Sequence, residues 1–126
     1  PPGGGLSLLL VEDDPTVAEV IGGLLRGLGH EVLHVPHGLA ALAEAEGRAF
    51  DMALLDLDLP GITGLALASH LRARGFDAPL LAVTARADAQ AEALARDAGF
   101  DGFLRKPVTA DMLGEAIDAL RPAMAG

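Results

Sequence analysis

The sequence lacks several residue types, and each absence excludes a class of protein. It has no cysteine, which excludes a disulfide framework, a thiolate zinc site and a cysteine nucleophile. It has no tryptophan or tyrosine and only 3% aromatic residues, so its core must be aliphatic. The net charge of −9 argues against a nucleic-acid surface, which would need a basic patch. No apolar run approaches the roughly 20 residues of a membrane span, and no signal peptide is visible.

The length indicates a single domain. A chain of 126 residues is long enough to bury a substantial core. The Pro-Pro-Gly-Gly-Gly start over residues 1–5 indicates a linker or an expression remnant. We expect the domain itself over 6–121 and a short C-terminal tail over 122–126.

Apolar runs alternate five times with segments of helical periodicity. The expected strands cover 6–11, 31–35, 52–56, 80–83 and 102–105, and the expected helices cover about 15–28, 38–46, 64–74, 88–98 and 110–120. Alternation of this kind, with fully apolar strands, predicts a parallel sheet covered by helices on both faces. Leu39 and Leu42 are expected on the inner side of the second helix. Leu94 is the only large apolar residue of the fourth helix.

Polar residues follow four of the five expected strands. Glu12 and Asp13 follow the first, Asp56 ends the third, Thr84 follows the fourth and Lys106 follows the fifth. In open α/β sheets, ligands bind outside the carboxyl ends of the strands, where the strand order reverses. Three carboxylates gathered there would repel one another, and a hard divalent cation relieves this repulsion. Mg²⁺ suits the site best because it takes a few carboxylates and keeps several waters.

This set of groups predicts phosphoryl chemistry. A cation and an ammonium neutralise phosphoryl oxygens, and a hydroxyl orients one of them. Asp56, at the centre, is the natural nucleophile, since carboxylates form aspartyl phosphates. Lys106 is the only lysine in a chain that otherwise uses arginine, and a compact ammonium fits where a planar fork would not.

The chain resembles the receiver domain of two-component response regulators over residues 6–120. The motifs that carry the resemblance occur in the family's order and spacing: Val11-Glu12-Asp13, Asp56 with Pro60 and Gly64 after it, Thr84-Ala85, Phe103 and Lys106-Pro107. The resemblance implies a flavodoxin-like (βα)5 fold. This is an α/β three-layer sandwich around a five-stranded parallel sheet in the order 2-1-3-4-5.

The resemblance also implies a phosphorylation-dependent switch rather than a turnover enzyme. In this reading Asp56 accepts a phosphoryl group from a phosphohistidine on a histidine kinase or histidine phosphotransfer protein, and slow autodephosphorylation removes it. Glu12, Asp13, Asp56 and the backbone carbonyl of Asp58 would hold Mg²⁺.

Three further residues would respond to the phosphoryl group. Thr84 and Lys106 would contact it, and Phe103 would turn inward behind Thr84. A phenylalanine lacks the hydroxyl of the tyrosine that is common at this position, so the switch must work by packing. Family members usually have a cis peptide at the equivalent of Lys106-Pro107.

The output face that the resemblance implies comprises the 88–98 helix, the 102–105 strand and the 110–120 helix. A homodimer through this face is a further expectation. The domain itself is expected to contact neither nucleic acid nor membrane. Its expected place is the cytoplasm, free or as the cytoplasmic part of a membrane-bound hybrid kinase. The 101–108 stretch looks most like hybrid-kinase receivers, while a stand-alone receiver and a transcription factor's receiver stay open.

Asp58 and Arg86 lie two residues beyond Asp56 and Thr84. We hypothesise an ion pair between them that covers the site and tunes the lifetime of the phosphoryl group. The alternative is two solvated side chains, since exposed pairs contribute little.

The spacing of the four histidines (His30, His34, His37 and His70) suggests no metal site.

Two other functions compete with the switch. Asp56-Leu57-Asp58 after an apolar strand also resembles the opening motif of haloacid dehalogenase-type phosphatases, with Asp58 as general acid and base. In that family the acidic pair follows the nucleophile strand, whereas Glu12 and Asp13 precede it, and Pro60 stands where Thr or Val is usual. The other competitor is a receiver-like module that is never phosphorylated. Retention of all five site residues argues against it.

Overall fold

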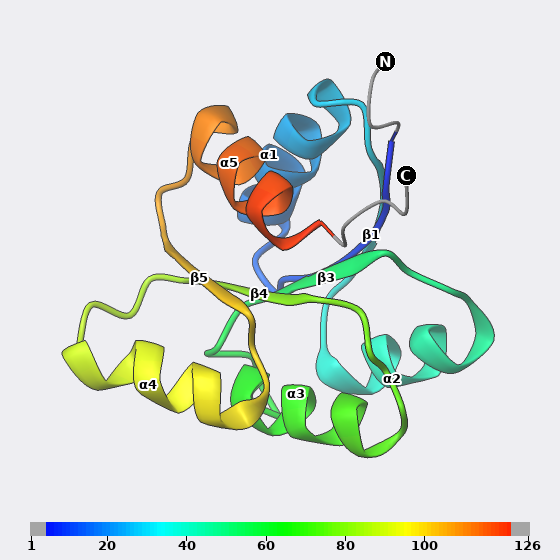
Figure 1. The fold of residues 1–126 in the computed structure, drawn as a ribbon, viewed down its shortest axis with the longest axis vertical. Helices are drawn as coiled ribbons and strands as arrows, with labels where there is room; N and C mark the ends of the chain where they lie inside the picture. Colours follow the sequence, from blue (N-terminus) through cyan, green and yellow to red (C-terminus); the bar gives the residue numbers. More distant parts are fainter. Residues whose placement is uncertain (1–4, 122–126) are drawn as a thin grey trace.

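The computed structural model describes residues 5–121, and within them five parallel strands alternate with five helices (Figure 1). The strands are β1 (Ser7–Val11), β2 (Glu31–Val35), β3 (Met52–Leu55), β4 (Leu80–Thr84) and β5 (Gly102–Arg105). The helices are α1 (Pro15–Gly27), α2 (Gly38–Gly47), α3 (Gly64–Ala73), α4 (Ala89–Ala98) and α5 (Ala110–Leu120). The sheet order β2-β1-β3-β4-β5 confirms the predicted topology. The expected linker, apart from Gly5, and the expected tail lie outside the described residues.

Helices cover both faces of the sheet. Helices α1 and α5 lie on one face, and α2, α3 and α4 lie on the other (Figure 1). Successive strand residues point to opposite faces, so β1 sends Leu8 and Leu10 to the first layer and Leu9 and Val11 to the second. Among the described residues, the first layer contains no aromatic residue, and all four phenylalanines of the chain lie in or against the second. None of the described helices is long and apolar enough to cross a membrane.

The inner side of α2 differs from expectation at one residue. Leu39 is 66% exposed, not inward-facing, because Gly38, Ala41 and Leu42 form the inner side of α2. Gly38 packs so closely there that an added Cβ would lie 3.1 Å from Cβ of Ile62. Leu94 is also exposed, and α4 rests on the sheet through two buried alanines.

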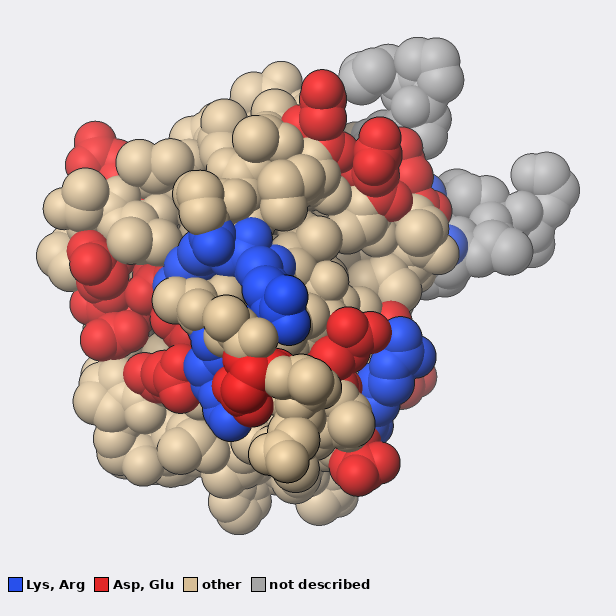
Figure 2. Space-filling model, turned by 90° about the vertical axis from the view of Figure 1, so that its left-hand side faces the viewer, with Lys and Arg blue, Asp and Glu red and all other residues tan. Residues whose placement is uncertain are grey.

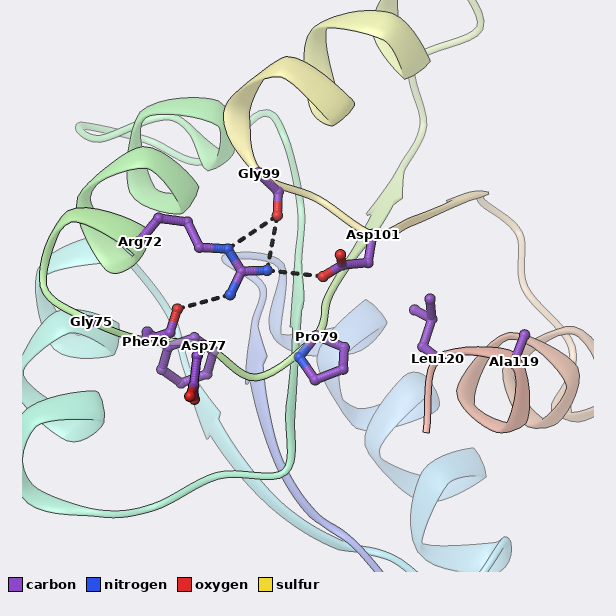
Figure 3. Close-up of a pocket in the computed structure, with 9 residues that line it drawn as sticks. All are labelled: Arg72, Gly75, Phe76, Asp77, Pro79, Gly99, Asp101, Ala119 and Leu120. Atoms are coloured by element: carbon purple, nitrogen blue, oxygen red, sulfur yellow. Dashed lines mark hydrogen bonds and ion pairs between the residues drawn. The ribbon is translucent and has the colours of Figure 1, made fainter. Parts of the chain in front are cut away.

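Arg72 fastens several segments at the amino-terminal ends of β4 and β5 (Figure 3). Its Nε and Nη2 donate to the carbonyl oxygen of Gly99 at 3.2 and 2.9 Å. Its Nη1 donates to the carbonyl oxygens of Phe76 and Ala78 at 2.8 and 2.7 Å, and Nη2 also donates to Oδ2 of Asp101 at 2.8 Å. All five N–H groups of the guanidinium therefore bind within the chain. Arg72 borders a cavity of about 630 Å³ at the end of the sheet away from the predicted site.

Candidate functional site

The carboxyl ends of four strands bring the predicted site residues together. Glu12 and Asp13 follow β1, Asp56 follows β3, Thr84 ends β4 and Lys106 follows β5. One carboxylate oxygen from each of the three acids lies within 4.8 Å of the others. Glu12 is 2% exposed, Asp56 8% and Thr84 0%, whereas Asp13 is exposed to solvent. The three carboxylates thus lie together at the carboxyl ends of the strands, as the sequence predicts, and two of them are buried.

Lys106 compensates the two buried carboxylates. Its Nζ donates to Oε1 of Glu12 at 2.5 Å and to Oδ2 of Asp56 at 2.8 Å. Burial lowers the pKa of this ammonium, but its hydrogen bonds to Asp56 and Glu12 and their charges more than offset burial and raise the pKa overall. The Lys106-Pro107 peptide is cis, as the family resemblance implies. The lysine thus holds the site together as a charged, hydrogen-bonded group.

The β3–α3 loop returns sharply over Asp56. The amide of Asp58 donates to Oδ1 of Asp56 at 3.0 Å, and the amide of Gly64 donates to the carbonyl oxygen of Leu57 at 2.9 Å. An added Cβ at Gly64 would lie 2.1 Å from the carbonyl oxygen of Asp56, so only glycine allows this approach. The conformation of the loop is therefore set by these two hydrogen bonds and by the close approach of Gly64 to the backbone of Asp56.

The hypothesised ion pair between Asp58 and Arg86 is not formed. Arg86 instead binds Asp88, with Nε and Nη2 each 3.1 Å from a carboxylate oxygen. Oδ2 of Asp58 accepts the hydroxyl of Thr84 at 3.4 Å, and the amide of Arg86 donates to Oγ1 of Thr84 at 3.3 Å. Arg86 prefers the acid two residues away because this bidentate contact is local and needs no ordering of a second loop.

The donor set fits a small divalent cation. Ligands on one Mg²⁺, at about 2.1 Å from the ion, lie roughly 3–4 Å apart in an octahedral arrangement. Glu12, Asp13 and Asp56 offer carboxylate oxygens that lie within 4.8 Å of one another, so a small movement brings them onto one ion, and Asp13 faces solvent, where bound water can remain. Oxygen-only donors suit Mg²⁺ better than a soft metal. The carbonyl of Asp58 as a further ligand stays a prediction.

One residue at the edge of the site was missed by the sequence reasoning. His34 lies near the end of β2, and its Nε2 is 2.7 Å from the backbone carbonyl oxygen of Glu12. The other two histidines of this region bind elsewhere: Nδ1 of His30 accepts the amide of Leu6, and Nδ1 of His37 accepts the amide of Ala40. Only the register of β1 against β2 could have placed His34 beside Glu12.

Fold and site together define a flavodoxin-like α/β protein with an acidic, lysine-bearing site at the carboxyl edge of its sheet. The model of the response regulator receiver domain matches residues 8–118, and the chain belongs to this family.

Relatives with this domain include both regulators and a kinase. The sensory transduction protein RegX3 of Mycobacterium tuberculosis is 39% identical over 114 residues, which are 90% of this chain and 50% of that protein. The sensor histidine kinase RcsC of Salmonella typhimurium is 30% identical over 112 residues, 89% of this chain and 12% of the kinase. The chain thus spans about half the length of RegX3 and a small part of RcsC.

Two solved structures share the architecture. The receiver domain of the sensor histidine kinase PA1611 from Pseudomonas aeruginosa, with a magnesium ion coordinated in its active site cleft, is 33% identical. It superimposes with a TM-score of 0.85 over 93% of this chain and 98% of that chain. The response regulator TrrA of Thermotoga maritima, in complex with Mg²⁺ and BeF, is 29% identical with a TM-score of 0.82, over 90% and 97% of the two chains.

Proposed function

We propose that this chain is a phosphorylation-dependent signalling switch in which Asp56 accepts a phosphoryl group from a phosphohistidine. The observation that carries the proposal is the position of the Asp56 carboxylate, 2.8 Å from Nζ of Lys106 and within 4.8 Å of the oxygens of Glu12 and Asp13. A carboxylate oxygen of Asp56 attacks phosphorus as the P–N bond to histidine breaks. The bond's electron pair stays on the imidazole nitrogen, which takes up a proton. The donor is a histidine kinase or a histidine phosphotransfer protein.

The surrounding groups act on the charge of the transferred group. Mg²⁺, held by Glu12, Asp13, Asp56 and the carbonyl of Asp58, would neutralise phosphoryl oxygens. Lys106 is already inside the site, so its ammonium donates to a phosphoryl oxygen with little reorganisation.

Thr84 links the site to the output face. Its hydroxyl donates to Asp58 before phosphorylation and would donate to a phosphoryl oxygen afterwards. Because the amide of Arg86 donates to the same hydroxyl oxygen, the loop before α4 would follow it. Phe103, which packs partly buried against the α2–α3–α4 core, would then turn inward. We therefore replace the hypothesised Asp58–Arg86 pair with another route. Asp58 is released from Thr84 on phosphorylation and in this way tunes the lifetime of the phosphoryl group.

The output face is formed by α4, β5 and α5. Figure 2 shows the side of the molecule where these elements lie, with basic side chains in the middle and acidic ones around them. Mixed charge of this kind suits a second copy of the same face, since each sign can meet its opposite, and we propose homodimerisation through it. We place the switch over residues 6–121, in the cytoplasm or in the cytoplasmic part of a hybrid kinase.

Phosphorylation by a small donor tests the proposal. Purified protein is incubated with acetyl phosphate with and without Mg²⁺, and its intact mass is followed with time. We expect one added phosphoryl group per chain, dependent on Mg²⁺, in the wild type and in the control variant Asp77→Asn, whose acid is exposed and distant. Asp56→Asn should add none. Equal labelling of Asp56→Asn, or rapid turnover of small phosphomonoesters, would contradict the proposal, and turnover would favour a phosphatase.

A further inference from the structure

We propose that His34 is a positioning residue that orients the Glu12-Asp13 turn and thereby sets the affinity of the site for Mg²⁺. This inference rests on the proposed function, because that function assigns the metal to these two acids. His34 lies on the edge strand β2, exposed to solvent, and contributes no ligand. It acts through the backbone of Glu12.

The hydrogen bond from His34 takes the place of a backbone hydrogen bond between β1 and β2. Strands β1 and β2 pair in register up to Val11 and Val35. The amide of Glu12 still donates to the carbonyl oxygen of Val35 at 3.2 Å, but β2 ends there and Pro36 follows. The carbonyl oxygen of Glu12 then receives its hydrogen bond from the ring of His34, at 2.7 Å. A carbonyl oxygen only accepts, so Nε2 of His34 must carry the proton.

This hydrogen bond lies where it can orient the two acids expected to bind the metal. The carbonyl of Glu12 belongs to the planar peptide that joins Glu12 to Asp13, so fixing its direction fixes the backbone between both acids. The Glu12 carboxylate is held as well, with Oε1 bound by Lys106 and Oε2 accepting the amide of Asp14 at 3.1 Å. Without His34, the peptide plane is the part of this turn that can rotate. Groups that orient metal ligands commonly change metal affinity although they never touch the ion.

His37 supplies a matched control. It follows the same strand, is also exposed, and its Nδ1 accepts the amide of Ala40 at 3.2 Å to cap α2. Its loss removes one histidine–backbone hydrogen bond from the same region without touching Glu12. A general loosening of the β2 region would therefore affect variants of His34 and His37 alike.

The test measures Mg²⁺ binding without any phosphoryl donor, by calorimetry or by amide NMR shifts. We expect His34→Leu to weaken binding by about 3–10-fold, at or below the lower end of the roughly 10–100-fold typical of such groups, because the ring is exposed. His34→Gln, which keeps a donor at similar reach, should restore binding to within about twofold of the wild type. His37→Ala should lose stability in urea yet bind Mg²⁺ like the wild type. If His34→Leu fails to fold, His34→Asn, with a shorter amide, takes its place.

Wild-type affinity in His34→Leu, or equal weakening in His34→Leu and His37→Ala, overturns the inference while leaving the proposed function intact. Failure of glutamine to rescue overturns it too, because a donor would then be irrelevant. If the wild type itself shows no Mg²⁺ binding that Asp56→Asn weakens, the proposed function fails, and the inference fails with it.

Discussion

Replacing Arg72 with methionine should unfold this domain far more readily than the same change two residues away at Arg74. Methionine keeps much of the aliphatic stem and removes all five N–H donors. Three backbone carbonyls, of Phe76, Ala78 and Gly99, lose a donor, and Asp101 loses its ion pair. Arg74 makes a single ion pair with Glu46, in which both side chains are at least half exposed.

The expected magnitudes follow from these contacts. Each of the three carbonyls that keeps a donor contributes about 1 kcal/mol net, with the two bonds to Gly99 counted once, which gives about 3 kcal/mol. The Arg72–Asp101 pair adds less than about 1 kcal/mol, because the Asp101 side chain is 47% exposed. Arg72→Met should therefore cost about 3–4 kcal/mol, and Arg74→Met less than about 1 kcal/mol. Against a total stability of about 5–15 kcal/mol, the first change is large.

Urea unfolding followed by far-ultraviolet circular dichroism measures both variants, since the chain has no Trp or Tyr for fluorescence. With a slope of about 1–3 kcal/mol/M, the midpoint of Arg72→Met should fall by at least about 1 M. Affinity for Mg²⁺ should not change, because Arg72 lies at the other end of the strands. A loss in Arg72→Met as small as that in Arg74→Met would refute the reasoning.

Three more predictions concern the packing of a glycine, the stability of the domain at low pH and the lysine of the site. Gly64→Ala should destabilise by about 2 kcal/mol or more because its Cβ meets fixed backbone, whereas Gly23→Ala, with open space around it, should gain up to about 1 kcal/mol. Equal effects in urea would contradict this. Burial, followed by the charge of Arg121, lowers the pKa of His30, so the unfolded chain binds more protons and stability should fall as pH drops below about 6.5. In His30→Gln the urea midpoint should fall less steeply as the pH is lowered. An unchanged dependence of the midpoint on pH would contradict this prediction. Lys106→Met should lower the free energy of unfolding by about 2–4 kcal/mol without Mg²⁺. Added Mg²⁺ should raise the melting temperature of this variant more than that of the wild type, as measured by thermal denaturation. An equal rise in both proteins would contradict this prediction.

The sheet and the gathering of the site could be predicted because each depends on a local pattern. The central strands β1, β3 and β4 are nearly continuous apolar runs, since both faces of the sheet are covered there. Their topology then brings every polar strand end to one edge, so Asp56 and Lys106 meet although they are fifty residues apart. Element boundaries also followed the sequence closely, with β3 ending one residue earlier than expected, at Leu55.

Other features depended on packing that no short stretch encodes. Leu39 and Leu42 are three residues apart and could share a helix face, but the inner stripe of α2 is set by how closely Gly38 approaches Ile62. The partner of Arg86 likewise depended on loop conformation, because the sequence offers two candidate acids, Asp88 two residues away and Asp58 on the loop that follows a neighbouring strand. His34 became significant only through the register of two strands.

Chemical mapping of the acceptor tests the central claim most directly. After incubation with acetyl phosphate and Mg²⁺, borohydride reduces an aspartyl phosphate to homoserine, and peptide mass spectrometry locates the changed residue. The account predicts homoserine at Asp56 and at no other acid, with none in Asp56→Asn. Homoserine at Asp13 or Asp58 in the wild-type chain, with Asp56 unchanged, would contradict it.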